Sequence, residues 1–204
     1  MNNDRFDRQI QFIIEIDQLK HVLRQTVLMD ASRRENDAEH SWHLAMMAIL
    51  LSEYAREEVD LLRVVKMVLI HDLVEIDTGD TFCYDEEGQE SRVEREQKAA
   101  DRIFHILPGD LAEELHTLWE EFEARETPEA RFAAALDRFQ PLLHNFCTQG
   151  VAWRKHGITS DQVIARNQHI EAGAPALWAY ARQFIEDAVS KGFLAPDPDA
   201  PRES

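Results

Sequence analysis

The chain has 204 residues, and its 22 Lys and Arg against 39 Asp and Glu give a formal net charge of −17. Such a field repels polyanions, so no nucleic-acid polymer is expected as a partner, whereas a metal or a local arginine can still attract a small anion. With 44% hydrophobic residues, the chain should form one soluble domain with a real core. Only seven Gly and seven Pro are present, too few turn residues for a many-stranded sheet, so the composition predicts an all-α fold.

The chain also carries features that indicate a cellular compartment. Its two cysteines, Cys83 and Cys147, are too few for a disulfide framework and lack the spacing of a metal motif, so both are expected to be reduced thiols. The first residues, MNNDRFD, contain no apolar segment typical of a signal peptide. The longest apolar run, residues 44–51, is far too short to span a membrane. These features predict a cytoplasmic protein with no membrane partner.

Apolar residues recur at helical spacing along most of the chain. The polar stretch 32–40 is expected to be a linker in which Asp37 caps the next helix. Gly79 should end a helix, and the acidic segment 82–90 should be a mobile loop. Thr127 is expected to cap the helix that follows it. The expected helices, about eight in all, cover roughly 8–29, 38–56, 60–77, 91–107, 109–125, 127–147, 159–171 and 174–191.

The segment MVLIHDLVEIDTGD (67–80) contains the most informative polar residues. His71 and Asp72 interrupt an apolar helix, where an unpaired charge is costly to bury. Glu75 follows one turn later, about 40° around the helix from His71 and about 60° from Asp72. An imidazole and a carboxylate that point into an apolar interior suit a divalent cation. The alternative is a buried His–Asp hydrogen bond, with Glu75 in solvent.

Two further residues could complete a metal site. His40 stands where the polar linker becomes an apolar helix, although His43, one turn later, is a competing candidate and either could be a capping or core histidine. Asp137 is a lone carboxylate inside the helix expected at 127–147, and a buried salt bridge is its alternative role. Pro141 lacks the N–H that would bond the carbonyl of Asp137, so a kink is expected there.

In this order, His40, His71-Asp72 and Asp137 (H-x30-HD-x64-D) resemble the HD-domain metal-dependent phosphohydrolase superfamily. The flanking sequences AEHSWHLA, MVLIHDLVEIDTGD and ALDRFQPLLHN are similar to those of small bacterial 5′-deoxynucleotidases and their HD domain-containing relatives. The similarity runs from about residue 18 to 157. It implies a single helical HD domain, expected over residues 1–192 and followed by a disordered tail at 193–204. It also implies that these four residues bind one divalent metal, with Mn, Co, Mg, Zn and Fe as candidates.

The resemblance further implies a function and additional site residues. Glu75 matches a residue that activates or positions the attacking water. Asp80 matches an acidic residue beside the substrate, and Arg24 matches an arginine near the substrate phosphate. An exposed helix arginine is the alternative for Arg24. The implied reaction is release of phosphate from nucleoside 5′-monophosphates, with deoxyribonucleotides as candidates. The alternatives are a phosphodiesterase or alarmone-type hydrolase and a non-catalytic metal-binding module.

The resemblance also implies a homodimer. The apolar residues of the helix expected at 174–191 could supply the interface, or could be ordinary core.

Overall fold

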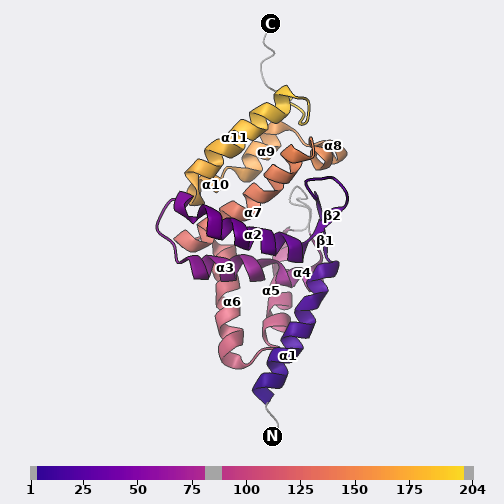
Figure 1. The fold of residues 1–204 in the computed structure, drawn as a ribbon. Helices are drawn as coiled ribbons and strands as arrows, with labels where there is room; N and C mark the ends of the chain where they lie inside the picture. The colour runs from indigo at the N-terminus through magenta and orange to yellow at the C-terminus, as the bar shows by residue number, and fades with distance from the viewer. Residues whose placement is uncertain (1–3, 81–88, 200–204) are drawn as a thin grey trace.

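The computed structural model describes residues 4–80 and 89–199. These residues form helices apart from one two-stranded sheet, which confirms the prediction of an all-α fold. Figure 1 shows an elongated molecule in which α1 extends toward one end and α11 lies at the other, with α2 and α3 crossing between them. Within the described residues, no helix is both long and apolar enough to cross a membrane.

The N-terminal region differs from the single helix expected over 8–29. Helix α1 (Asp4–Ile16) and the 3₁₀-helix η1 (Asp17–His21) are followed by strand β1 (Leu23–Val27), which pairs antiparallel with β2 (Arg34–Asn36). The helical prediction is therefore wrong from residue 23 onward. β1 has strand partners in β2, and such tertiary pairing outweighs the weak intrinsic preference of a short segment.

The N-cap of helix α2 (Asp37–Leu51) lies one residue earlier than expected. Asn36, not Asp37, is the N-cap, because its side chain accepts a hydrogen bond from the backbone N–H of Glu39 while the Glu39 side chain accepts one from the N–H of Asn36. The side chain of Asp37 is thereby free for another role, and it is completely buried. The 3₁₀-helix η2 (Ser52–Tyr54) ends this part of the chain.

The helix expected over 60–77 is divided into three pieces. Helix α3 (Leu61–Ile70) leads into the 3₁₀-helix η3 (His71–Val74) and the short helix α4 (Glu75–Thr78). The tighter 3₁₀ turn changes the angles between successive side chains where the polar residues occur. Gly79 ends α4 with φ of +73°, as expected for a glycine after a helix. Most of the mobile loop expected at 82–90 lies outside the described residues.

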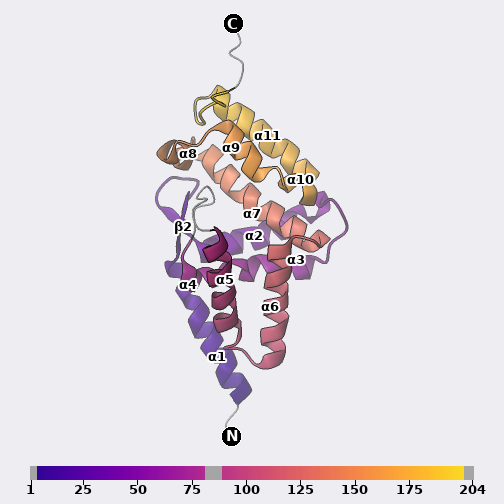
Figure 2. The ribbon, with the colours of Figure 1, turned by 180° about the vertical axis from the view of Figure 1, so that it is seen from behind.

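The second half of the chain surrounds one long helix. This helix, α7, begins after Thr127, whose side chain accepts from the N–H of Ala130 as expected, and it continues without interruption through Pro141. It packs against α2, α3, α6, α10 and α11, and both views show it inside the upper half of the molecule (Figures 1 and 2). The elements of this half are α5 (Gln89–Phe104), α6 (Gly109–Ala124), α7 (Pro128–Cys147), α8 (Val151–His156), α9 (Ser160–Asn167), α10 (Ile170–Gly173) and α11 (Pro175–Ser190).

The C-terminal helix is part of the core. Leu177, Trp178 and Ile185 of α11 are buried within the chain itself, as the second interpretation of this helix anticipated. Leu194 is also buried, and the N–H of Ser160 donates to the carbonyl of Ala195. The packed part of the chain therefore continues past residue 192, where the sequence-based boundary was placed.

The close packing of α10 on α7 requires a glycine at position 173. A Cβ added to Gly173 would lie 2.1 Å from the backbone carbonyl oxygen of Arg131, whereas one added to Gly109 would meet nothing within 4 Å. We expect Gly173→Ala to lower the free energy of unfolding by about 1–3 kcal/mol, the usual cost of overpacking. Gly109→Ala should be neutral or slightly stabilising, because alanine favours helix. Urea denaturation of both variants checks this, and equal stability would contradict the packing described.

Candidate metal centre and active site

Four of the predicted polar residues, which come from α2, η3 and α7, lie close together. His40 of α2 places Nε2 3.0 Å from Oδ1 of Asp137 on α7 and 3.9 Å from Oδ2 of Asp72. His71 of η3 places Nε2 3.1 Å from Oδ1 of Asp72 and 3.7 Å from Oδ1 of Asp137. Two imidazole nitrogens and two carboxylates thus face one another, although they are up to 97 residues apart in the sequence.

The hydrogen bonding of His71 is that of a metal ligand. Its Nδ1 lies 3.0 Å from the carbonyl oxygen of Val68, and because a carbonyl can only accept, Nδ1 carries the proton. Nε2, which a metal would bind once this nitrogen has lost its proton, is directed toward Asp72 and Asp137 and is buried. Metal-binding histidines are commonly held in this way by a backbone carbonyl. The two nitrogens and two carboxylates suit a divalent cation.

The electrostatics of the cluster also favour a cation. Burial lowers the pKa of His71, but the negative charges of Asp72 and Asp137 outweigh this effect and raise the pKa to about 10. Burial, then the charge of Arg24, lower the pKa of His40 to about 4. One imidazole thus holds a proton between the carboxylates while the other stays neutral. Positive charge is needed at this position, and a metal ion would supply it.

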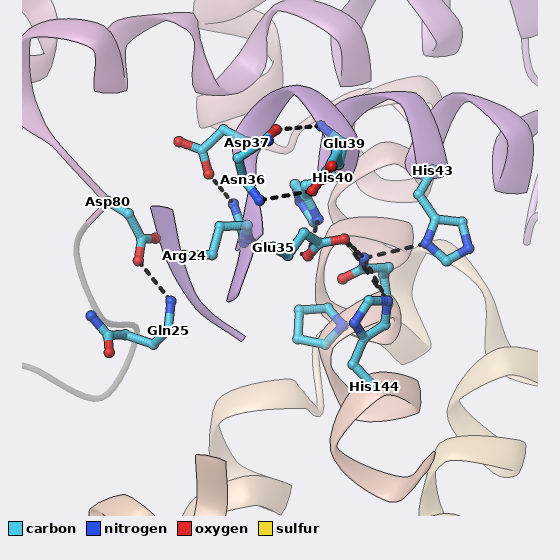
Figure 3. A network of polar contacts seen from close by, with 12 residues as sticks. Arg24, Gln25, Glu35, Asn36, Asp37, Glu39, His40, His43, Asp80 and His144 are labelled. Atoms are coloured by element: carbon cyan, nitrogen blue, oxygen red, sulfur yellow. Dashed lines mark hydrogen bonds and ion pairs between the residues drawn. The ribbon is translucent and has the colours of Figure 1, made fainter. Parts of the chain in front are cut away.

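Arg24 is close to the predicted cluster but is already engaged with acidic residues. Its Nη1 donates to Oδ2 of Asp72 at 2.8 Å and to Oδ1 of Asp37 at 3.1 Å. Figure 3 shows the guanidinium beside Asp37. Arg24 is therefore not an exposed helix arginine, since it lies on a strand and its side chain is largely buried. Sequence reasoning missed Asp37 because it read this segment as a polar linker.

Glu75 and Asp80 form a second acidic group with Asp37. One oxygen of each carboxylate lies within 4.8 Å of the others. Oδ2 of Asp80 accepts a hydrogen bond from the backbone N–H of Gln25 (Figure 3). Burial, then the charges of Asp72 and Asp37, raise the pKa of Glu75 well above its ordinary value. Glu75 is thus not a fifth member of the His40 cluster, but a proton-holding group next to it.

His43 belongs to a different cluster and does not replace His40. The side-chain nitrogen of Gln140 lies 2.7 Å from Oε1 of Glu35, 3.0 Å from Nε2 of His144 and 3.4 Å from Nδ1 of His43. Figure 3 shows Glu35, His43 and His144 turned toward one another. These three could also hold a cation, but the amide of Gln140 occupies the space between them. The sequence left open whether His40 or His43 joins the His71-Asp72 pair. The structure places His40, not His43, beside Asp72 and Asp137.

The metal cluster and the acidic group open into one pocket. Six predicted residues line it, together with two arginines that sequence reasoning missed, Arg125 and Arg138. Arg138 directly follows Asp137, which was a usable signal, whereas nothing in the sequence distinguishes Arg125. The lining also has an apolar part that includes the buried indole of Trp153. The predicted residues in the lining, besides Arg24, are His71, Asp72, Glu75, Asp80 and Asp137.

The role of His71 as a ligand can be tested by metal content. We expect His71→Ala protein to lose bound divalent metal, because one of four donors and the balance of charge are both removed. His105→Ala is the matched control, since the exposed side chain of His105 contacts the carbonyl of Asp101 in the preceding helix. Elemental analysis after dialysis measures occupancy, and full occupancy in His71→Ala would exclude this site.

Comparison with known proteins agrees with the geometry. Residues 16–178 match the family described as HD domain. Human 5′-deoxynucleotidase HDDC2 is 33% identical over 135 residues, 66% of this chain and 65% of the human protein, so slightly less than two thirds of that relative is spanned. A crystal structure of a predicted metal-dependent phosphohydrolase from Magnetospirillum magnetotacticum MS-1 is 57% identical, with a TM-score of 0.90, over 95% of this chain and all of that one. A conserved hypothetical protein from Pyrococcus furiosus, 22% identical with a TM-score of 0.59, shares the fold. The chain belongs to the HD domain family.

Proposed function

We propose that this protein is a metal-dependent phosphohydrolase that releases phosphate from nucleoside 5′-monophosphates, including deoxyribonucleotides. The observation that carries the proposal is a buried set of two imidazoles and two carboxylates at the wall of a pocket that also contains a proton-holding carboxyl group. The names of the human relative, a 5′-deoxynucleotidase, and of the bacterial one, a predicted metal-dependent phosphohydrolase, support the reaction class.

The four residues His40, His71, Asp72 and Asp137 would hold one divalent cation, for which Mn, Co, Mg, Zn and Fe are the candidates. When bound, such an ion lowers the pKa of a water molecule and offsets phosphate charge. The protein orients the ligands through the Val68 carbonyl on His71 and through packing around the fully buried His40.

Proton transfer and substrate binding are assigned to three neighbouring residues. Glu75 moves a proton between the attacking water and the leaving group, since its carboxyl group lines the pocket and burial raises its pKa well above its ordinary value. Asp80 is fixed beside it by the N–H of Gln25 and faces the substrate. Arg24 offers Nη2 to the phosphate, because only its Nη1 is hydrogen bonded among the described residues.

We also propose that the protein acts in the cytoplasm as a homodimer. Large apolar side chains are exposed on the adjacent helices α2 and α3, where Trp42, Leu50 and Leu62 are each more than 60% accessible. This face is a better candidate interface than α11, whose apolar residues are core. Light scattering that gives the mass of one chain, 23.6 kDa, would contradict the dimer.

A panel of nucleotides tests the function itself. Metal-loaded protein should release phosphate from nucleoside 5′-monophosphates, and a chelator should abolish the activity. Cyclic nucleotides and guanosine tetraphosphate belong in the panel, because hydrolysis of these alone would replace the proposed substrate class. Absence of hydrolysis with all five metals would instead indicate a binding module.

Glu75→Gln separates proton transfer from metal binding. The amide is nearly isosteric but cannot accept a proton, so we expect turnover to fall on the order of 100- to 10,000-fold while bound metal and fold are retained. Glu58→Gln, on an exposed side chain, is the control and should be as active as the unmodified protein. A near-normal rate for Glu75→Gln would show that Glu75 has only a hydrogen-bonding role.

A further inference from the structure

Two arginines line the pocket without a hydrogen-bonded acidic partner among the residues that the structure describes. Arg125 and Arg138 both line the pocket, and the Nε atom of each is buried without a hydrogen bond. By contrast, Arg63 is paired with Glu121, and the chain as a whole has a large excess of carboxylates. Two guanidinium groups left without strong partners in such an acidic protein therefore need a separate explanation.

Arg125 occupies a backbone position at which glycine is usual. It follows the last residue of α6 with φ of +55°, in the left-handed region, and its N–H donates to the carbonyl of Glu121. A side chain costs energy in this conformation, whereas glycine does not. Such strain at a pocket is a common sign of a functional position. Among the residues the structure describes, Arg125 forms no close ion pair, although the charges of Asp137 and Glu123 attract it.

Arg138 connects this part of the pocket with the proposed metal centre. It directly follows the ligand Asp137 on α7, and its Nε lies 3.6 Å from Oδ2 of that carboxylate, too far for a good hydrogen bond. Asp137 is already directed toward His40 and His71. The guanidinium of Arg138 therefore has donors to offer to a molecule bound next to the metal site.

The positive charges at this end of the pocket repel one another. Burial, and then the charge of Arg138, lower the pKa of Arg125, and Arg166 contributes in the same direction. Nε of Arg166 is also buried and unpaired. Glu123 lines the pocket too, but it lies on the exposed side and its charge has a smaller effect on Arg125 than those of Arg138 and Asp137. An anion bound between the arginines would relieve this repulsion.

We propose that Arg125 and Arg138 form a clamp for the phosphate group of the substrate, beside the metal site. The inference rests on the proposed function and assigns phosphate binding to residues beyond Arg24. Arg24 donates through Nη1 to Asp37 and Asp72 and so chiefly balances carboxylates. Guanidinium groups match phosphate oxygens in a two-point geometry, and charge-assisted hydrogen bonds of this kind are strong. The clamp thus holds the phosphate next to Asp137, the proposed metal ligand that Arg138 contacts.

Calorimetric titration of metal-loaded protein with inorganic phosphate tests the clamp directly. We expect Arg125→Gln and Arg138→Gln each to weaken phosphate binding about tenfold or more, the usual effect of losing a charge-assisted hydrogen bond. Arg138→Lys keeps the charge but not the two-point geometry and should be intermediate. Arg182→Gln is the matched control, because this exposed arginine of α11 is paired only with Glu186. Thermal unfolding and metal content of each variant show whether fold and metal site are intact.

The outcomes separate the clamp from the proposed function. With nucleotides, the two glutamine variants should raise KM more than they lower kcat. If the unmodified protein hydrolyses nucleotides and folded variants bind phosphate as tightly as Arg182→Gln, the clamp is wrong and the function stands. If the unmodified protein hydrolyses none of the nucleotides but loses phosphate binding in both variants, the anion site is supported and the proposed function is wrong. Loss of binding in Arg182→Gln as well would reveal a general charge effect and overturn the clamp.

Discussion

The main constraint on the structure is the cluster of acidic side chains around the buried Arg24. Removal of so many carboxylates from water is unfavourable unless each has a partner, and Arg24 directly bonds only two of them. The negative charges of Asp72 and Asp137 outweigh burial and raise the pKa of His71 to about 10, so the cluster favours a further positive charge. A divalent metal at the imidazole and carboxylate cluster would satisfy this requirement. The carboxylates are those of Asp37, Asp72, Glu75, Asp80 and Asp137.

The local departures from regular helix serve this centre. The β1–β2 pair brings Arg24 next to Asp37 at the start of α2, and the 3₁₀ turn η3 presents His71 and Asp72 together. Helix α7 supplies Asp137 and, one residue later, Arg138. The proposed metal site and the proposed phosphate site are therefore built partly on the same helix. A phosphate ester needs both kinds of group: positive charge to stabilise its oxygens and a carboxyl group to move a proton. The pocket provides them side by side.

Sequence reasoning succeeded where local chemistry determines the outcome. The cap at Thr127 and the stop at Gly79 follow from residue type and spacing. The convergence of His40 with the His71-Asp72 pair and Asp137 agrees with what the resemblance to HD domains implies. It failed where tertiary contacts determine the local structure or the role of a residue. The strand that carries Arg24 reads as helix until its partner strand is known, and Asp37 reads as a cap until its burial is seen. Arg125 could not be singled out, because only the folded chain places it in the pocket wall together with Arg138.

The central claim is that one divalent cation belongs at the meeting point of α2, η3 and α7. Anomalous X-ray scattering from crystals soaked in Mn²⁺ tests it most directly. We predict a strong peak about 2.0–2.4 Å from Nε2 of His40, Nε2 of His71 and carboxylate oxygens of Asp72 and Asp137, the usual range for such ligands. A peak at Glu35, His43 and His144 instead, or no peak in crystals of protein whose activity requires manganese, would contradict the account.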